Sequence, residues 1–244
     1  MIIALAVIAA LLVATYWLAF PIVVRVVAAG VPRSALEAIG SQTLASLDEG
    51  LLEPTTLPAP RQQEIASAFG RLSLPPEIAT HTRIEFRRSE ALGANALALP
   101  SGVVVVTDGL VALAEDTDDV VAVLAHEVGH LEGHHSMRAI VQSTLVSGLI
   151  TLVAGDVSAL AAAAPAALLN ARYSRSLERE ADGYAVHALR ATGVQPTRLA
   201  DMLERMEAEH AKAGRDGPEG MFSYLSTHPT TDERLKTLRN EPGS

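Results

Sequence analysis

The residues whose types and spacing best suit chemistry are His126, Glu127 and His130, which form an H-E-x-x-H pattern. On a helix, residues four apart lie nearly above one another, so both imidazoles can face one metal ion, with Glu127 about 100° round from His126. Zinc binds neutral imidazole readily, and a neighbouring carboxylate can take a proton from the attacking water. The pattern therefore indicates a zinc hydrolase.

A third protein ligand is needed, because two histidines alone do not hold a catalytic zinc. The stretch 178–182, Glu-Arg-Glu-Ala-Asp, is the best downstream source. On a helix Glu178 and Asp182 share a face, whereas Glu180 points elsewhere. One of the two carboxylates on the shared face can bind the metal, and the other can orient a ligand imidazole.

The elements that would position these residues begin with a small predicted sheet. Ile84–Phe86 alternates, Ala96–Leu99 is short and extended up to Pro100, and Val103–Val106 is a β-branched run between turn residues. Strands of this kind give a helix one apolar face to pack against. We expect the helix that carries the H-E-x-x-H pattern to use that face.

Asp116 can cap that helix, which is predicted to begin near Thr117, by accepting from free backbone N–H groups. His126 and His130 lie about a third of a turn from the apolar face, so the helix can pack on the sheet and still present both imidazoles to a cleft. The apolar face consists of Val120, Leu124, Val128 and Leu131.

Further helices are predicted over 174–191 and 197–212, and from 230 or 231 to 239, with a flexible loop over 214–220. Aromatic residues make up only 4% of the chain and alanine is heavily used, which favours packed helices over a large sandwich. The predicted fold class is α+β, mainly helical with a small sheet.

Composition limits the function classes. A chain of 244 residues suffices for one sizeable domain, and 49% hydrophobic residues indicate contact with lipid. The net charge of −9, without a stripe of Lys and Arg, excludes a nucleic-acid partner. The sequence has no cysteine, so any metal must be bound by nitrogen and oxygen ligands.

The segment Ile2–Val24 contains no charged residue and is long enough to cross a bilayer as a helix. We interpret residues 1–29 as one N-terminal transmembrane anchor, in a bacterial inner membrane. A cleaved signal peptide or a buried core helix are the competing interpretations. Arg25 and Arg33 follow the segment, and by the positive-inside rule they favour a cytoplasmic catalytic side.

Two other regions shape the domain organisation. Residues 30–80 are rich in proline and are predicted to be a linker or small helical prelude to a domain over 81–244. Residues 139–169 are apolar, but Asp156 divides them into halves that are short for a crossing. A single crossing would separate His130 from ligands beyond residue 170, so this region is either a hairpin touching the membrane or a helical pair packed on the domain.

Several passages, in this order, resemble the gluzincin metallopeptidases of the HtpX, BepA and CAAX-prenyl-protease type. The resemblance covers roughly residues 80–240, and its combination of motifs is much more specific than H-E-x-x-H alone. The passages are Asn95-Ala-Leu-Ala-Leu-Pro100, Val104-Val-Val-Thr-Asp-Gly109, His126-Glu-Val-Gly-His130, Ser174-Arg-Ser-Leu-Glu-Arg-Glu-Ala-Asp182 and Thr227-His-Pro-Thr-Thr-Asp-Glu-Arg234.

The resemblance implies a zincin-like domain that binds one Zn²⁺ ion. By it, His126, His130 and Glu178 are the expected zinc ligands. Glu127 is the expected general base, and Asp182 is expected to orient a ligand from outside. Members of this type cleave peptide bonds, often in membrane-associated or misfolded proteins, so polypeptide substrates and a membrane are the expected partners.

The resemblance also suggests that the strand ending at Leu99–Pro100 is a sheet edge on which an extended substrate pairs, since backbone pairing recognises unfolded chains without demanding a sequence. In BepA-like relatives the histidine that matches His228 can occupy the fourth zinc position and hold the enzyme inactive. A loop histidine stacked on its neighbours is the equally weighted alternative.

Arg234 matches an arginine that follows the His-Pro segment in relatives, where a guanidinium near zinc could stabilise a tetrahedral oxyanion. A salt bridge on the helix surface with Glu233 or Asp232 is the alternative that the residues favour. His134 and His135 continue the region after His130, and we assign both a structural or surface role rather than ligation.

The leading hypothesis is a membrane-anchored zinc endopeptidase active in protein quality control. One alternative is a chaperone-like protein that binds substrates while its zinc site stays latent. Another is a purely structural metal site, against which the intact Glu127 argues, because a structural zinc has no use for a base.

Overall fold

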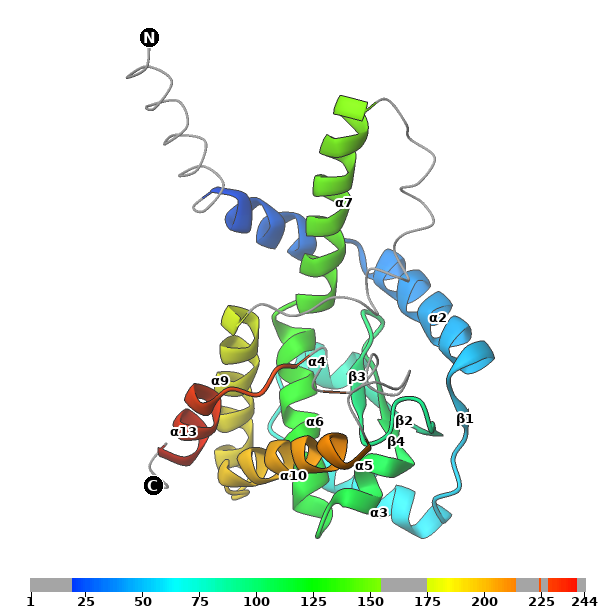
Figure 1. The fold of residues 1–244 in the computed structure, drawn as a ribbon, viewed down its shortest axis with the longest axis vertical. Helices are drawn as coiled ribbons and strands as arrows, with labels where there is room; N and C mark the ends of the chain where they lie inside the picture. The colour runs from blue at the N-terminus through cyan, green and yellow to red at the C-terminus, as the bar shows by residue number, and fades with distance from the viewer. Residues whose placement is uncertain (1–18, 155–174, 214–223, 225–227, 241–244) are drawn as a thin grey trace.

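The computed structural model describes residues 19–154, 175–213, 224 and 228–240 (Figure 1). A helix over Ala19–Ala29 comes first in the described chain. The elements that follow are α2 (Arg33–Gly50), β1 (Glu53–Pro54), α3 (Ala59–Phe69), α4 (Pro76–His81), β2 (Arg83–Arg88), β3 (Ala96–Ala98), β4 (Val103–Thr107), α5 (Asp108–Leu113), α6 (Thr117–Glu132), α7 (His135–Ala154), α9 (Arg175–Ala191), α10 (Thr197–Ala213) and α13 (Asp232–Asn240).

The four strands form one mixed sheet in the order β1-β2-β4-β3. β2 and β4 are parallel, whereas β1 pairs with β2, and β3 with β4, in antiparallel fashion. All five residues of β4 are buried, which is why this strand is a continuous β-branched run. The three predicted strands are confirmed, and β3 lies at an edge of the sheet.

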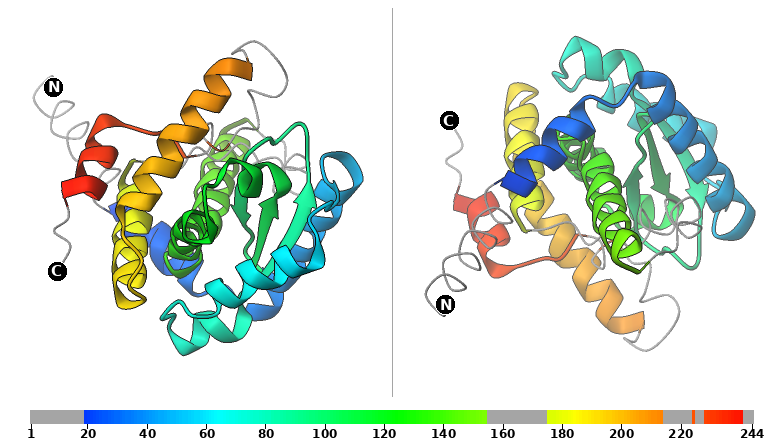
Figure 2. Two further views of the ribbon diagram at one scale, coloured as in Figure 1. Left: turned by 90° about the horizontal axis from the view of Figure 1, so that it is seen from below. Right: turned by 90° about the horizontal axis from the view of Figure 1, so that it is seen from above.

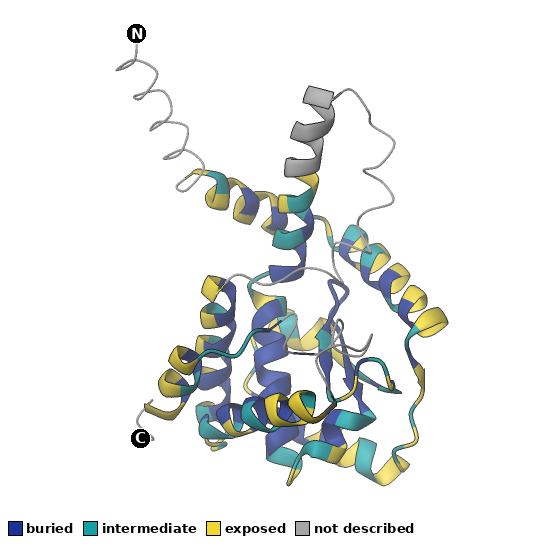
Figure 3. Cartoon of the chain, viewed as in Figure 1, coloured by how far each residue is buried: buried dark blue, intermediate teal, exposed yellow. Residues whose placement is uncertain are grey.

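α6 is the central helix, between the sheet on one side and α9 on the other (Figure 2). As predicted, Asp116 caps it: its Oδ1 accepts from the Asp119 N–H at 3.2 Å. The helix ends at Glu132, before Gly133. Every residue from Asp119 to His130 is buried (Figure 3), so Glu127 and both imidazoles lie within the protein.

The second half of the predicted prelude belongs to the same core as α6. Pro58 precedes α3, and the buried side of α3 packs against α6. Ile65, Phe69 and Leu72 are buried in one cluster with Val120 and Leu124. Residues 59–72 are therefore a structural part of the main body rather than a linker, because their apolar side chains find a partner in α6.

The late helices lie close to their predicted positions and complete the core around α6. α10 is fastened to the start of α6 by ion pairs: Asp119, fully buried, lies 3.0 Å from Arg198 Nη1 and 2.9 Å from Arg205 Nη2. The arrangement is mainly helical with a small mixed sheet, in agreement with the predicted α+β class.

Among the described residues, no single helix is both long and apolar enough to cross a bilayer. The helix over Ala19–Ala29 and α2 meet that criterion only together, and they are bent by 91° to each other. Residues 1–18 of the predicted anchor and 155–174 of the predicted hairpin lie outside the described residues. α7 covers the first half of that hairpin and projects from the body (Figure 1).

Candidate metal centre

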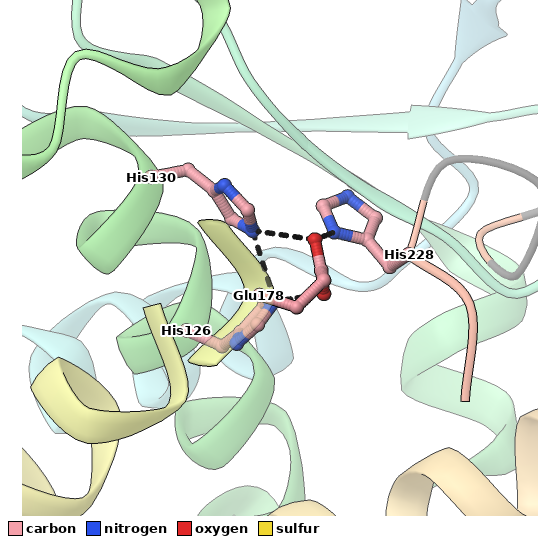
Figure 4. Close-up of side chains that lie close together, drawn as sticks. All are labelled: His126, His130, Glu178 and His228. Carbon is pink, nitrogen blue, oxygen red and sulfur yellow. Dashed lines mark hydrogen bonds and ion pairs between the residues drawn. The ribbon is translucent and has the colours of Figure 1, made fainter. Parts of the chain in front are cut away.

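Four side chains from three parts of the chain converge beside the sheet (Figure 4). His126 and His130 come from α6, Glu178 comes from the first turn of α9, and His228 comes from the segment that precedes α13. One potential ligand atom from each lies within 4.8 Å of the others, and all four residues are buried. The sequence predicted that the two imidazoles face a cleft, and both are buried here.

The separations between these atoms fit one tetrahedral ion. His126 Nε2 and His130 Nε2 are 3.0 Å apart, and they lie 3.4 and 3.5 Å from the Glu178 oxygens. His228 Nδ1 lies 3.1 Å from Glu178 Oε1. Ligands bound tetrahedrally to zinc at 2.0–2.1 Å would be about 3.3 Å apart. The residues present therefore fit a metal such as zinc.

Close packing of α6 and α9 brings the ligands from the two helices together. Gly129 faces α9, and a Cβ atom at this position would lie 2.8 Å from the backbone of Ala181. Only a glycine lets the two backbones approach this closely. His126 and His130 flank Gly129 on α6, and Glu178 and Asp182 flank Ala181 on α9, so the glycine contact places both pairs face to face.

Asp182 and Arg234 form the support behind the ligands. Asp182 Oδ1 lies 2.9 Å from His126 Nδ1. Burial opposes protonation of His126, but its contacts with Asp182 and Glu178 outweigh this and raise its pKa to about 9. Arg234 donates to both oxygens of Asp182, at 2.8 Å each, and its Nη1 lies 2.8 Å from Glu178 Oε2.

The surface salt bridge that the sequence favoured for Arg234 is wrong, because this side chain is buried at 5% exposure. Its guanidinium also donates to the Pro229 carbonyl at 3.1 Å. The whole fork is thus engaged by Asp182, Glu178 and Pro229, which leaves it a part of the support rather than a group facing a substrate.

Glu127 points away from its helical neighbours toward the sheet edge. Its Oε2 accepts from the Ala98 N–H of β3 at 3.1 Å, and its Oε1 lies 3.8 Å from His228 Nε2. Burial raises the pKa of the Glu127 carboxyl, while positive charge on His228 and His126 and a hydrogen bond from Tyr224 act against it. A carboxyl with a raised pKa beside a group of potential metal ligands is suited to take up and release a proton.

His228 is held by an aromatic side chain that sequence reasoning missed. Tyr224 stacks on its imidazole, with 4.4 Å between ring centres and 23° between planes. The His228 N–H also donates to the Tyr224 carbonyl at 2.8 Å, so the two side chains belong to one turn. Their i, i+4 spacing was the available signal. His228 is only 2% exposed, and its stacking on Tyr224 is compatible both with a loop histidine packed on its neighbours and with a fourth ligand.

His135 is a second residue that the sequence analysis left in a structural or surface role. It is fully buried, and its Nδ1 lies 2.7 Å from Nδ1 of His130. Burial and the nearby Arg138 lower the pKa of His135 to about 4, so the imidazole is neutral. Its neighbour His134, partly exposed, has a left-handed backbone with φ of 50°.

Comparison with known proteins agrees with this geometry. The model of the family described as Peptidase family M48 matches residues 59–242. The chain is 30% identical over 148 residues to the mitochondrial metalloendopeptidase OMA1 of Schizosaccharomyces pombe, which covers 59% of this chain and 42% of that protein.

Two Escherichia coli proteins are also similar. The metalloprotease YcaL is 27% identical over 217 residues, covering 85% of this chain and 80% of that protein. The beta-barrel assembly-enhancing protease is 27% identical over 159 residues, covering 60% of this chain and 32% of that protein. The chain therefore spans less than half the length of two of these three relatives.

Proposed function

The chain belongs to peptidase family M48 and is a metallopeptidase, and on that premise we propose that it is a membrane-anchored zinc endopeptidase. Its substrates are misfolded or membrane-associated proteins, so its role is protein quality control. The observation that carries the proposal is the convergence of two imidazoles from α6 and one carboxylate from α9, at the separations of a tetrahedral site, next to Glu127.

In this proposal His126, His130 and Glu178 hold one Zn²⁺ ion. When bound, zinc supplies Lewis acidity toward the scissile carbonyl and the attacking water. Glu127 takes the proton from that water and passes it to the leaving amine, a transfer for which its raised pKa suits it. Asp182 holds His126 in the orientation that directs Nε2 toward the metal.

Substrate recognition is assigned to the edge strand β3. Leu99 N–H donates to the Val103 carbonyl, so in an antiparallel ladder the backbone groups of Ala98 face away from β4. The Ala98 N–H meets Glu127 at 3.1 Å. The Ala98 carbonyl accepts from Ser136 Oγ at 3.3 Å, so an extended peptide that pairs with this edge displaces both contacts and then has its backbone beside the proposed base. Such pairing suits unfolded chains, because it reads the backbone rather than a sequence.

The fourth position is assigned to His228, which acts as an internal inhibitor in the resting protein. Its Nδ1 lies within the cluster, 3.1 Å from Glu178 Oε1, and Tyr224 stacks on its outer face. Glu127 is 1% exposed and His126 and His130 are as deeply buried, so a peptide reaches the site only after His228 moves away. Displacement of His228 is thus the activating step.

Membrane attachment is assigned to residues 1–29, with the helix over Ala19–Ala29 as its described end. The helix exposes apolar side chains, and Leu145 of α7 is exposed as well. The helix over Ala19–Ala29 lies on the same side of the body as α7 (Figure 1). This supports contact of the 139–169 region with lipid. The exposed apolar residues of the helix are Ile22, Val23, Val26 and Val27.

The test is metal analysis of the purified protein together with casein degradation, for the wild type and Glu127→Gln. We expect both proteins to hold one zinc per chain, and only the wild type to cleave. Because glutamine has nearly the same shape as glutamate but cannot accept the proton, retained proteolysis in Glu127→Gln would overturn the role of this residue.

The switch is tested with His228→Ala in the same assay. We expect a higher cleavage rate at unchanged zinc content, since the three remaining ligands suffice to hold zinc. An unchanged rate with unchanged zinc would remove the inhibitory role.

The enclosed site also favours a second candidate, a chaperone-like protein whose metal site stays latent. For this candidate we expect the wild type to bind unfolded casein without cleaving it, and His228→Ala not to cleave casein either. Cleavage by either protein decides for the peptidase.

A further inference from the structure

The two imidazoles of α6 are supported in different ways. His126 Nδ1 lies 2.9 Å from a carboxylate, Asp182 Oδ1. His130 Nδ1 instead lies 2.7 Å from Nδ1 of another imidazole, that of His135. Both α6 residues turn their Nε2 atoms toward the cluster. The Nδ1 atoms are therefore the ones available for support, and each is supported by a different chemical group.

The direction of the hydrogen bonds follows from the ligand role. A neutral His130 that binds metal through Nε2 carries its proton on Nδ1 and must donate it. His135 Nδ1 accepts this hydrogen bond, so a neutral His135 carries its own proton on Nε2. That Nε2 lies 3.5 Å from Glu180 Oε2. The result is a directed hydrogen bond from His130 to His135, whose outer nitrogen faces the Glu180 carboxylate.

The backbone between α6 and α7 is built to place the His135 ring in this position. The left-handed backbone at His134 interrupts the helical path, and α7 begins at His135. A Cβ atom at Gly133 would collide with the His135 imidazole. The glycine that ends α6 therefore leaves the space that the ring fills.

The Glu180 carboxylate, which His135 faces, is also held in place. Glu180 Oε2 accepts from Arg138 Nη1 at 2.9 Å, and Arg25 Nη2 of the N-terminal helix lies 3.3 Å from the same oxygen. Glu180 faces this side of α9, away from the Glu178 and Asp182 pair. Helical spacing turns Glu180 away from the metal ligands. Its carboxylate is thus the one in the 178–182 stretch that faces His135.

We propose that His135 is the positioning residue for the ligand His130, with Glu180 as its carboxylate, just as Asp182 positions His126. The inference rests on the proposed ligand role of His130 and deepens it. Partners that orient ligand imidazoles typically change metal affinity 10–100-fold when they are removed. We expect a loss of that size without loss of fold.

The test measures zinc affinity by competition with a chromophoric chelator, for the wild type, His135→Ala, His135→Asn and His135→Gln. The asparagine amide can occupy the place of Nδ1, whereas the glutamine amide occupies the place of Nε2. We expect zinc affinity about 10–100-fold weaker for the alanine and glutamine variants. The asparagine variant should recover most of it, because its amide oxygen accepts from His130.

Thermal unfolding of the metal-free forms separates positioning from structure. The three variants fill the space of the imidazole differently and should differ in stability. If His135 had only a structural role, zinc affinity would follow stability. If it positions His130, affinity is retained by His135→Asn and lost by His135→Gln. His187→Ala, at an exposed histidine of α9, is the matched control and should retain wild-type affinity. Equal affinity in wild type and all variants, or equal losses for asparagine and alanine, would overturn the proposal.

Gly133→Ala gives an independent arm, because the added methyl must displace the His135 ring. We expect this variant to lose affinity as His135→Ala does. The double variant should lose little more, since both changes break the same contact. Additive losses would contradict the proposal. Absence of zinc from the wild type itself would instead be a failure of the proposed function.

Discussion

The proposed metal centre consists of two halves that differ in how they are held. In the first half, α6 and α9 supply His126, His130 and Glu178, and the backbone contact of Gly129 with Ala181 sets their spacing. In the second half, His228 arrives on a turn before α13. α13 is fastened nearby by the ion pairs of Arg234 with its carboxylate partners, together with Leu238, which is buried in the core.

The difference separates a fixed set of three ligands from a fourth that can leave. Backbone packing has a single close-packed arrangement, and moving it disturbs the core. An ion pair can be exchanged for contacts with water or with a metal at lower structural cost. The three-ligand half is therefore suited to keep the metal while the fourth ligand is exchanged for substrate.

The largest expected effect comes from the charged half. Arg234→Gln leaves Asp182 and Glu178 buried without their cation, which typically costs about 3–5 kcal/mol of unfolding free energy. Zinc brings positive charge to the same carboxylates, so the loss should be greatest in the metal-free protein and smaller with zinc. Urea unfolding with and without zinc measures this difference.

Arg239→Gln is the control for the charged half. Arg239 lies on the same helix, but its partners Asp201 and Glu204 are exposed, and such pairs contribute about 0–1 kcal/mol. A loss for Arg234→Gln as small as that of the control, or one that zinc does not reduce, would contradict the division into two halves.

A smaller effect is expected when the packed half is changed. Gly129→Ala places a methyl group 2.8 Å from the Ala181 backbone and should cost about 1–3 kcal/mol. Because it separates α6 from α9, it should also weaken zinc binding, and added zinc should not restore stability. Calorimetry with zinc titration measures both quantities.

Gly183→Ala is its matched control, since a Cβ atom at Gly183 of α9 meets nothing within 4 Å. Alanine is the better helix former, so this variant should be slightly more stable, by about 0.5–1 kcal/mol. A Gly129→Ala protein with wild-type zinc affinity would show that backbone packing does not set the ligand spacing.

The smallest expected effect concerns the base of α6, far from either half. Burial opposes the charge on Asp119, but hydrogen bonds from Arg198 and the Glu115 N–H outweigh it and lower the pKa of this carboxyl. Its stabilising contribution is present above the unfolded pKa of about 3.9 and is lost as pH falls through the lower folded value.

Asp119→Asn should therefore be less stable by about 1 kcal/mol at pH 7 and should approach the wild type as the pH falls below about 4. Urea unfolding between pH 7 and pH 3 checks this. A gap between the two proteins that stays constant over this range would refute the link to Asp119. Zinc affinity at pH 7 should be unchanged, which distinguishes this site from both halves of the centre.

Sequence periodicity was enough for the packed half. The four-residue spacing of His126 and His130, and of Glu178 and Asp182, follows directly from the helix repeat, and α6 begins at its predicted cap. The strands were equally visible, because β-branched runs between turn residues are a local signal. Local signals of this kind need no knowledge of which helices meet.

The residues that were missed depend on contacts between distant segments. Arg234 resembled a surface arginine because its own helix is polar, and only the docking of α13 on α9 buries it. His135 resembled an extra surface histidine, because its role requires both the turn at His134 and the space beside Gly133. Residues 30–80 were predicted to be a linker or small helical prelude, and the packing of α3 on α6 depends on a surface that no local pattern contains.

The break between α6 and α7 has a mechanical consequence. α7 is about 30 Å long at 1.5 Å per residue, so a tilt of about 10° about its first residue swings its far end by about 5 Å. His135 is that first residue and sits at the pivot, where the displacement is smallest. A continuous helix would carry such a tilt into the turns that bear His126 and His130. The break acts as a joint, and it shields the ligands from leverage by the apolar arm.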